Sequence, residues 1–252
     1  MEKGTYRYRV ESRDVDFTLK ASLASLCDYI LRAAGDDADR NNFGVRDLNC
    51  DGCSWVLLRM CVEIYRRLEE HEDFSVRTWV NDVNRMMTTR NMIVGDASGE
   101  TVAAAVTQWA IIDTDKRRAV DVTARADFSY AIVKEPSPVK APVRIPVIDS
   151  QSEQMRKVVY SDIDFNRHVG SVKYIGWFCD MLPEEIIMNK EAARLDINYI
   201  HESRFGQELR VGMSDGAQSS FEVSTADGQP VCRAVITWKE TTPKTDALCP
   251  NV

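Results

Sequence analysis

Residues 160–178 have the sequence Tyr-Ser-Asp-Ile-Asp-Phe-Asn-Arg-His-Val-Gly-Ser-Val-Lys-Tyr-Ile-Gly-Trp-Phe, and this stretch guides the interpretation of the whole chain. Its first half carries polar residues at alternate positions, namely Asp162, Asp164, Asn166 and His168. Apolar residues then recur near the helical period, at positions 172, 175, 178, 181 and 182. The pattern predicts a polar loop that leads into a one-sided helix over residues 167–181.

The start of this predicted helix combines a carboxamide with an imidazole. Asn166 is a good candidate for the N-cap, because its side-chain oxygen can accept a hydrogen bond from an amide of the first turn. His168 would lie beside it, where outward-pointing amides favour an oxyanion. The arrangement suits catalysis. The alternative interpretation is a helix cap next to a surface histidine.

The same stretch occurs twice in the chain. Residues 14–26 align with residues 162–174, and both segments lead into an amphipathic helix. Three further pairs of segments follow in the same order: 59–67 with 194–202, 74–78 with 207–211, and 102–109 with 231–238. We therefore interpret the chain as two copies of one domain.

The two copies differ in the residues that could move protons. The second copy has Asn166, His168 and Glu202 where the first has Thr18, Lys20 and Arg67. A purely structural cap gives no reason for so selective a difference. We therefore expect the second copy to carry the chemistry.

Composition limits the class of protein. The chain has 252 residues, 44% of them hydrophobic and 28% charged, which suits two ordinary globular domains, each large enough for its own core. A net charge of -7 argues against a nucleic-acid partner. No apolar run is long enough for a membrane span, and the first residues lack the apolar core of a secretory signal. We expect a cytoplasmic protein.

The cysteines do not indicate a metal or redox site. Seven cysteines are scattered through both halves, as expected for reduced thiols in the cytosol. Cys50 and Cys53 form a single C-x-x-C without a second pair at zinc-binding spacing. We expect no metal and no organic cofactor.

The order of the predicted elements indicates an α+β fold. A helix over residues 19–33 is followed by strands over 54–65, 74–83, 86–96 and 101–113. The second copy repeats the plan with a strand over 155–161, the helix over 167–181, and strands over 193–203, 206–214, 218–226 and 230–240. Four prolines between residues 134 and 146 oppose both helix and central strand. We therefore assign residues 1–134 and 151–252 to two domains and residues 135–150 to a proline-rich linker.

These residues resemble the acyl-acyl carrier protein (acyl-ACP) thioesterase family, which is known from plant plastids and from bacteria. The resemblance rests on residues 162–177, on the segments 194–206 and 74–80, and on Trp-Val-Leu-Leu-Arg-Met at 55–60. It implies a tandem double hot-dog fold, in which each half wraps an antiparallel sheet around a long central helix. It also implies hydrolysis of fatty acyl-ACP, whose acyl chain is linked through 4'-phosphopantetheine, by a monomer or homodimer without a nucleic-acid or membrane partner.

Carried over by position, the family's catalytic residues correspond to Asp164, Asn166, His168 and Glu202. Plant members have a cysteine directly after the glutamate, whereas this chain has Ser203, so we expect direct attack by water. Glu202 would be the general base, and Asn166 with a backbone amide at the helix start would polarise the thioester oxygen. His168 would position the water or the substrate. Asp164 would hold the site in register or serve only a structural role.

The resemblance also implies a division of labour between the halves. The first, non-catalytic copy would line the acyl-chain pocket, with Met86, Met87 and Met92 as adaptable candidates. An acidic carrier protein needs a basic docking patch, for which the candidates are Arg66, Arg67, Arg85, Arg90 and residues 116–118.

Three other functions fit parts of the same pattern. One is an acyl-CoA thioesterase on the same fold, which a comparison of substrates would separate. A hot-dog dehydratase would instead release no thiol. A non-catalytic acyl-binding protein would have no need of Asn166, His168 and Glu202.

Overall fold

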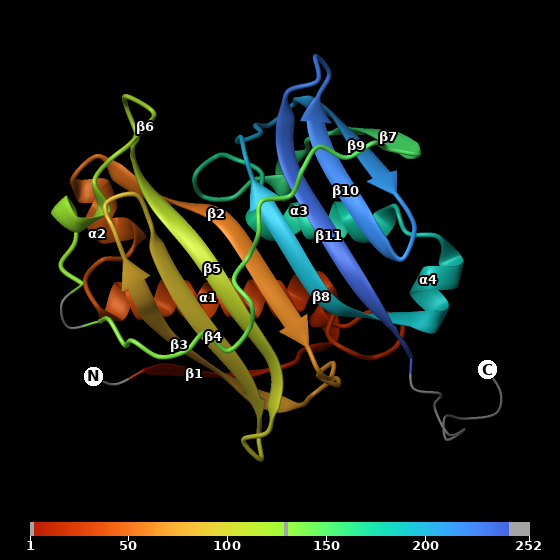
Figure 1. The fold of residues 1–252 in the computed structure, drawn as a ribbon, viewed down its shortest axis with the longest axis horizontal. Helices are drawn as coiled ribbons and strands as arrows, with labels where there is room; N and C mark the ends of the chain where they lie inside the picture. The colour runs from red at the N-terminus through yellow and green to blue at the C-terminus, as the bar shows by residue number, and fades with distance from the viewer. Residues whose placement is uncertain (1–2, 129–130, 242–252) are drawn as a thin grey trace.

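The computed structural model describes residues 3–128 and 131–241. Its strands form one eleven-stranded sheet (Figure 1). The strands are β1 (Gly4–Arg9), β2 (Cys53–Ile64), β3 (Asp73–Val83), β4 (Thr88–Asp96), β5 (Thr101–Asp113), β6 (Arg118–Ala119), β7 (Ser152–Lys157), β8 (Lys190–Tyr199), β9 (Glu208–Ser214), β10 (Gln218–Thr225) and β11 (Pro230–Glu240). The helices are α1 (Leu23–Arg40), α2 (Val45–Cys50), α3 (Ser171–Asp180) and α4 (Glu184–Asn189), with short 3₁₀ turns η1 (Ser12–Asp14), η2 (Val122–Ala124) and η3 (Tyr160–Asp162).

The strand order repeats itself in mirror fashion about the centre of the sheet. It runs β1-β3-β4-β5-β2 and continues β8-β11-β10-β9-β7, with β6 beside β5. The halves meet where β2 pairs antiparallel with β8, with Cys61 opposite Asp196. Apart from β6, each strand therefore has its counterpart in the other half, which confirms the expected α+β, tandem double hot-dog arrangement.

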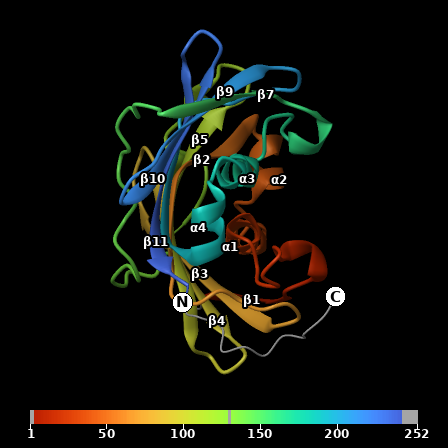
Figure 2. The same cartoon turned by 90° about the vertical axis from the view of Figure 1, so that its right-hand side faces the viewer.

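Both long helices lie on the same side of the curved sheet (Figure 2). Helix α1 buries a stripe that includes Leu26, Ile30, Ala33 and Ala34 against the sheet, as its helical spacing predicts. Helix α3 buries Tyr174, Ile175, Trp177 and Phe178. The two helices contact each other and form the inner layer of the molecule.

Both helices begin later than the sequence pattern predicts. Helix α1 begins at Leu23 and continues to Arg40, with the Ser22 hydroxyl accepting from the amide of Ser25. Helix α3 begins at Ser171 with Gly170 as its N-cap. The prediction that Asn166 caps α3 was therefore wrong. In each copy a turn separates the polar motif from the helix.

The two halves share one hydrophobic core. The largest cluster of buried residues combines α1 and strands β2 to β5 with α3 and strands β8 to β11. Met60 and Ile197, which are opposite each other on β2 and β8, are both fully buried within it. The largest cluster therefore spans both halves, because the central strand pair joins them.

Residues 134–150 contain no helix or strand and cross the outer face of the sheet (Figure 1). The buried side chain of Asn198 fixes this segment, accepting from the amide of Ile145 at 2.8 Å and donating to the carbonyl of Val143 at 3.0 Å. No helix within residues 3–128 and 131–241 is long and apolar enough to span a membrane.

Candidate active site

The polar motif before α3 is a tight loop organised by Asp164. One oxygen of its carboxylate accepts from the amides of Asn166 (2.8 Å) and His168 (3.2 Å). The amide of Asp164 donates to the carbonyl of His168 at 2.8 Å, and Arg167 at the turn has a φ of 64°. These bonds replace the helix cap expected at Asn166 and leave its side chain facing a cleft.

The first copy builds the same loop without the chemistry. Asp16 accepts from the amide of Thr18 at 2.9 Å, its own amide donates to the carbonyl of Lys20, and Leu19 has a φ of 58°. Because Asp16 and Asp164 do the same work in both copies, the shared aspartate determines the shape of the loop.

Asp162 also has a structural role. Its carboxylate accepts from the amide of Val159 at 2.9 Å, and its carbonyl accepts from the amide of Gly170. Asp14 makes the equivalent bonds in the first copy, to the amides of Glu11 and Ser22.

Glu202 reaches the motif because β8 ends early. The strand stops at Tyr199, three residues before the glutamate, and the amides of Ile200 and His201 both donate to the carbonyl of Val231. The amide of Val169 then donates to the carbonyl of Ser203 at 2.9 Å. This bond fastens the loop after β8 to the motif before α3.

The structure brings His168 and Glu202 into contact. The Nε2 atom of His168 is 3.1 Å from Oε2 of Glu202, and their side chains are 16% and 28% exposed. Burial and the nearby Arg117 guanidinium lower the pKa of His168 below its ordinary value, with Asp164 opposing and Arg204 adding to the shift. The imidazole is therefore neutral at pH 7 and can donate its Nε2 proton to the carboxylate.

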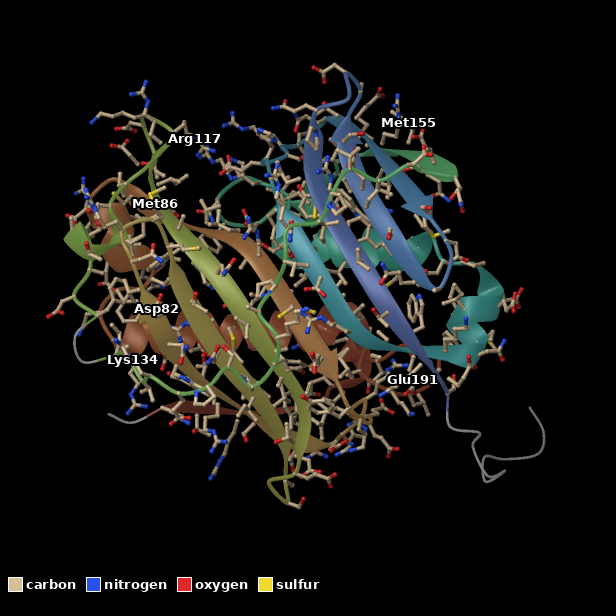
Figure 3. The ribbon with its side chains drawn as sticks, in the orientation of Figure 1. Asp82, Met86, Arg117, Lys134, Met155 and Glu191 are labelled. Atoms are coloured by element: carbon tan, nitrogen blue, oxygen red, sulfur yellow. The ribbon has the colours of Figure 1, made fainter. Side chains whose placement is uncertain are left out.

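Arg117 is a site residue that the sequence analysis missed. It comes from the first half, on the turn between β5 and β6 (Figure 3). Its guanidinium forms an ion pair with Glu202. The turn is tight: the Arg117 amide donates to the carbonyl of Asp113 at 2.9 Å, and Arg117 has a φ of 53°. The sequence signal is the basic run at residues 116–118, whose pattern alone favours a docking role.

In the first copy an arginine occupies the position of the glutamate. The guanidinium of Arg67 pairs with the Asp16 carboxylate and donates to Thr18 Oγ1 and to the carbonyls of Lys20 and Ala21. Lys20, at the position of His168, pairs with Glu191 at 2.9 Å. At these two positions the first copy has neither an imidazole nor a carboxylate, and its loop is held by ion pairs together with its backbone hydrogen bonds.

A cleft of about 1300 Å³ begins at the site and extends into the first half. One wall is the motif with Asp164, Asn166, His168 and Glu202, and another is the C-terminal part of α1. The inner end is lined by buried side chains from the first half: Phe43, Val80, Thr88, Arg90 and Phe128. A cleft of this shape can hold an extended apolar group with its reactive end at Glu202.

The methionines predicted for the pocket do not line this cleft. Met92 is fully buried in the shared core, and Met86 is 67% exposed on the turn between β3 and β4 (Figure 3). Their polarizable side chains suited a pocket, but Met86 lies on an exposed turn before β4 and Met92 packs into the core.

Most of the predicted docking arginines already bind carboxylates. Arg66 pairs with Glu72 and Asp96, Arg85 pairs with Asp121, and Arg90 is buried against Asp37. Around the cleft, exposed basic residues instead include Arg204 and Lys173.

Three other polar side chains take no part in the contact between His168 and Glu202. Ser203 is fully buried next to Glu202, while His71 and His201 are exposed. Within the described part of the chain, no three His, Cys, Asp or Glu side chains gather as metal ligands.

Comparison with known proteins gives a consistent result. Residues 2–127 match the model of the acyl-ACP thioesterase N-terminal domain, and residues 147–240 match that of the C-terminal domain. The crystal structure of an acyl-ACP thioesterase from Bacteroides thetaiotaomicron is 33% identical, with a TM-score of 0.88 over 94% of this chain and 98% of that one.

Plant proteins are also similar. The 12:0-ACP thioesterase from Umbellularia californica shares the fold, with a TM-score of 0.83 and 19% identity over 95% of this chain and 98% of that one. The oleoyl-acyl carrier protein thioesterase 2 of Arabidopsis thaliana is 30% identical over 59% of this chain and 44% of its own length. The chain thus spans less than half of this curated relative.

Proposed function

Since this chain belongs to the acyl-ACP thioesterase family, we propose that it hydrolyses fatty acyl-ACP to a free fatty acid and the thiol form of the carrier protein. The observation that carries the proposal is the contact between His168 and Glu202 at the head of a long cleft. Only one of the two copies has this pair, whereas the loop around it is common to both. A protein that only bound acyl chains would need the cleft but not the pair.

In this proposal Glu202 is the general base. It removes a proton from a water molecule as the water oxygen bonds to the thioester carbon. The carbon–sulfur bond then breaks, and the phosphopantetheine thiolate leaves with the carrier. Because a thiolate is a good leaving group, the site needs no strong acid beside the sulfur. The 28% exposure of the Glu202 side chain is consistent with access for water.

Asn166 and His168 support this step in different ways. The Asn166 side chain lies on the cleft wall, where its amide can donate to the carbonyl oxygen as negative charge develops there. The neutral imidazole of His168 donates to Glu202, which orients the carboxylate and avoids a second positive charge beside Arg117. Asp164 is a positioning residue, because it fixes the amides of both neighbours.

Arg117 would complete the site from the other half of the molecule. Its guanidinium stabilises the ionised form of Glu202, which is the form that a general base requires. Because Arg117 is 43% exposed at the cleft, it can also meet an arriving anionic carrier.

The proposed partner is an acyl carrier protein with a 4'-phosphopantetheine-linked chain, and we place the reaction in the cytoplasm with the enzyme as monomer or homodimer. Free thiols at the six described cysteines support a reducing compartment. Exposed basic residues at the cleft, Arg117, Lys173 and Arg204, support an acidic partner.

The direct test is thiol release from matched acyl-ACP and acyl-CoA thioesters. We expect a higher kcat/KM for acyl-ACP and a large loss of kcat in Asn166→Ala and His168→Ala, with Asn49→Ala as a control on the same cleft away from the motif. A clear preference for acyl-CoA would assign the site to the other thioester. Acyl binding without thiol release from either substrate would contradict hydrolysis.

A further inference from the structure

The turn between β5 and β6 brings Arg117 to the site, although the residues of the turn lie at the surface. Asp115, Lys116 and Arg118 are exposed, so apolar packing does not hold the turn in place. Arg117 nevertheless forms its ion pair with Glu202, which belongs to the other half of the chain. A loosely held surface turn would let this long side chain move away from the carboxylate. The position of Arg117 therefore depends on hydrogen bonds within and around the turn.

Asp113 accepts most of these hydrogen bonds. One oxygen of its carboxylate, Oδ1, accepts from the amides of Asp115 at 3.1 Å and Lys116 at 2.8 Å. Its carbonyl accepts from the amide of Arg117 at 2.9 Å. Chiefly through the Lys116 amide, these surroundings lower the pKa of Asp113, so its carboxylate is ionised at neutral pH. Three successive amides of the turn thus donate to one residue.

Thr114 ties the same turn to the wall of the cleft. Its amide and its Oγ1 hydroxyl both donate to the carbonyl of Gly52, at 2.9 Å and 3.0 Å. Gly52 lies between α2 and β2, and α2 lines the cleft with Arg46 and Asn49. The turn is therefore fixed to an element that itself forms part of the cleft.

The backbone conformation of Arg117 also points to a function. Its φ of 53° lies in the left-handed region, which favours glycine. In the turns between β4 and β5 and between β10 and β11, glycines adopt this conformation, namely Gly99 (φ 89°) and Gly228 (φ 86°). A residue other than glycine costs conformational energy there, and such strain is concentrated at functional sites, where the surroundings hold it. The hydrogen bonds of the turn thus hold a strained residue whose side chain reaches the carboxylate at the site.

We propose that Asp113 is a positioning residue for the reaction, because its carboxylate holds the turn in the conformation that keeps Arg117 beside Glu202. Asp113 does not touch the substrate in this scheme and acts only through Arg117. Because both side-chain bonds end on Oδ1, the role depends on the place of one oxygen atom and not on the charge. The effect on rate rests on the proposed function, since it assumes that Glu202 is the base.

The first test is kcat/KM for thiol release from acyl-ACP. Asp113→Ala removes the acceptor of two amides, so we expect kcat/KM to fall about threefold to tenfold. Asp113→Asn keeps an oxygen at the same place, and we expect it to recover most of the lost rate. The matched control is Asp96→Ala, because Asp96 Oδ1 accepts from the amides of Ser98 and Glu100 in the turn at the other end of β5. We expect this control to leave kcat/KM unchanged.

A double-mutant cycle with Arg117→Ala separates positioning from a general loss of stability. If Asp113 acts through Arg117, Asp113→Ala should have no further effect on kcat/KM once residue 117 is alanine. Equal effects of Asp113→Ala in both backgrounds would overturn the proposal. A wild-type kcat/KM in folded Asp113→Ala would do the same.

The titration of His168 reports the position of Arg117 without any substrate. Burial and then the Arg117 guanidinium lower the pKa of His168, so displacement of the guanidinium should raise it. We expect the midpoint measured by NMR to rise in Asp113→Ala, to return in Asp113→Asn and to stay at the wild-type value in Asp96→Ala. An unmoved midpoint in folded Asp113→Ala would contradict the positioning role.

Asp113→Glu keeps the test decisive if Asp113→Ala does not fold. It keeps the charge but displaces the carboxylate by one methylene group, so we expect a fall in kcat/KM and a rise in the His168 midpoint. Where only this variant folds, a wild-type rate with a wild-type midpoint would overturn the proposal.

The two readouts distinguish this inference from the proposed function. A raised His168 midpoint in Asp113→Ala, with no thiol release even by the wild type, would support the role of Asp113 in placing Arg117 and remove the proposed function. Equal thiol release by the wild type and Asp113→Ala, with an unmoved midpoint, would remove the inference and leave the function.

Discussion

At the scale of single residues, the two copies differ by what surrounds one shared aspartate. Asp16 and Asp164 fold the same loop, but Asp16 pairs with Arg67, whereas Asp164 lies beside the His168–Glu202 pair. In the first copy, Arg67 forms an ion pair with the shared aspartate, and this pair leaves no group that can accept a proton. In the second copy, the carboxylate of Glu202 stands at that position and can accept a proton.

The protonation state of His168 is open to direct measurement. Because burial and Arg117 lower its pKa, we expect His168 to titrate below the ordinary histidine value near 6.5. The chain has only three histidines, so NMR can follow each, with His168→Gln assigning the signal. Titration of His168 above the ordinary histidine value would contradict the account.

The same shift has a consequence for stability. The unfolded chain binds a proton at His168 at higher pH than the folded chain does, so stability rises with pH between the two pKa values. The loss of stability caused by His168 is fully present below the pKa of the folded state and absent above the pKa of the unfolded state. His168→Gln should therefore flatten the pH dependence of stability over that acidic window.

Arg117 gives a second prediction at this scale. Arg117→Ala removes the charge-assisted bond to Glu202, so we expect kcat/KM to fall about tenfold to a hundredfold. It also removes a cause of the low pKa of His168, which should therefore rise. The neighbouring exposed variant Arg118→Ala is the control. A normal rate and an unmoved histidine titration in Arg117→Ala would show that the ion pair has no role.

At the scale of the elements, the loop before each long helix folds in the same way in both copies, but only the loop of the second copy carries the groups proposed for catalysis. In the first copy, Arg67 holds this unit together through Asp16, Thr18 and two backbone carbonyls. The Arg67 side chain is only 15% exposed, so its guanidinium relies on these bonds.

Arg67→Ala should therefore lower the free energy of unfolding by about 1–3 kcal/mol, because buried acceptors lose their donor. Arg66→Ala next to it removes a more exposed side chain, 42% accessible, and should cost at most about 1 kcal/mol. Urea unfolding measures both. We expect kcat to remain near that of the wild type, since this loop lies in the non-catalytic copy. Equal effects of the two substitutions would contradict the role given to Arg67.

Sequence periodicity predicts the elements well and their junctions poorly. Strands β2 to β5 lie within two residues of the predicted limits, because β-branched and apolar residues are frequent there. The start of α3 was missed by four residues, because the Asp164 side chain organises a turn that resembles a cap in sequence.

The sequence predicted only those site residues that a comparison of the two copies could identify. Comparison of the copies singled out Asn166, His168 and Glu202, and the structure places all three on one cleft. Arg117 and the Asp37–Arg90 pair could not be found in this way. Their partners are 85 and 53 residues distant in the chain, and only the fold brings them together.

At the scale of the whole molecule, the halves depend on each other. The sheet continues from β2 into β8, one core crosses that boundary, and the site takes Arg117 from one half and Glu202 from the other. The proline-rich segment adds a further tie through Asn198.

The intact chain should therefore unfold in one cooperative transition, as calorimetry can show. Residues 151–252 expressed alone would expose the edge of β8 and the core face beneath it, so we expect aggregation instead of a folded monomer. A soluble monomer of that fragment with native near-UV circular dichroism would contradict this interdependence.

The central claim is that Glu202 activates the attacking water. The most direct measurement is kcat for thiol release from acyl-ACP by Glu202→Gln, which keeps the size of the side chain but cannot accept the proton. Glu208→Gln, on the exposed start of β9, is the matched control. We predict a loss of about 10²–10⁴-fold for Glu202→Gln and none for the control. A folded Glu202→Gln enzyme that retains the wild-type kcat would contradict the claim.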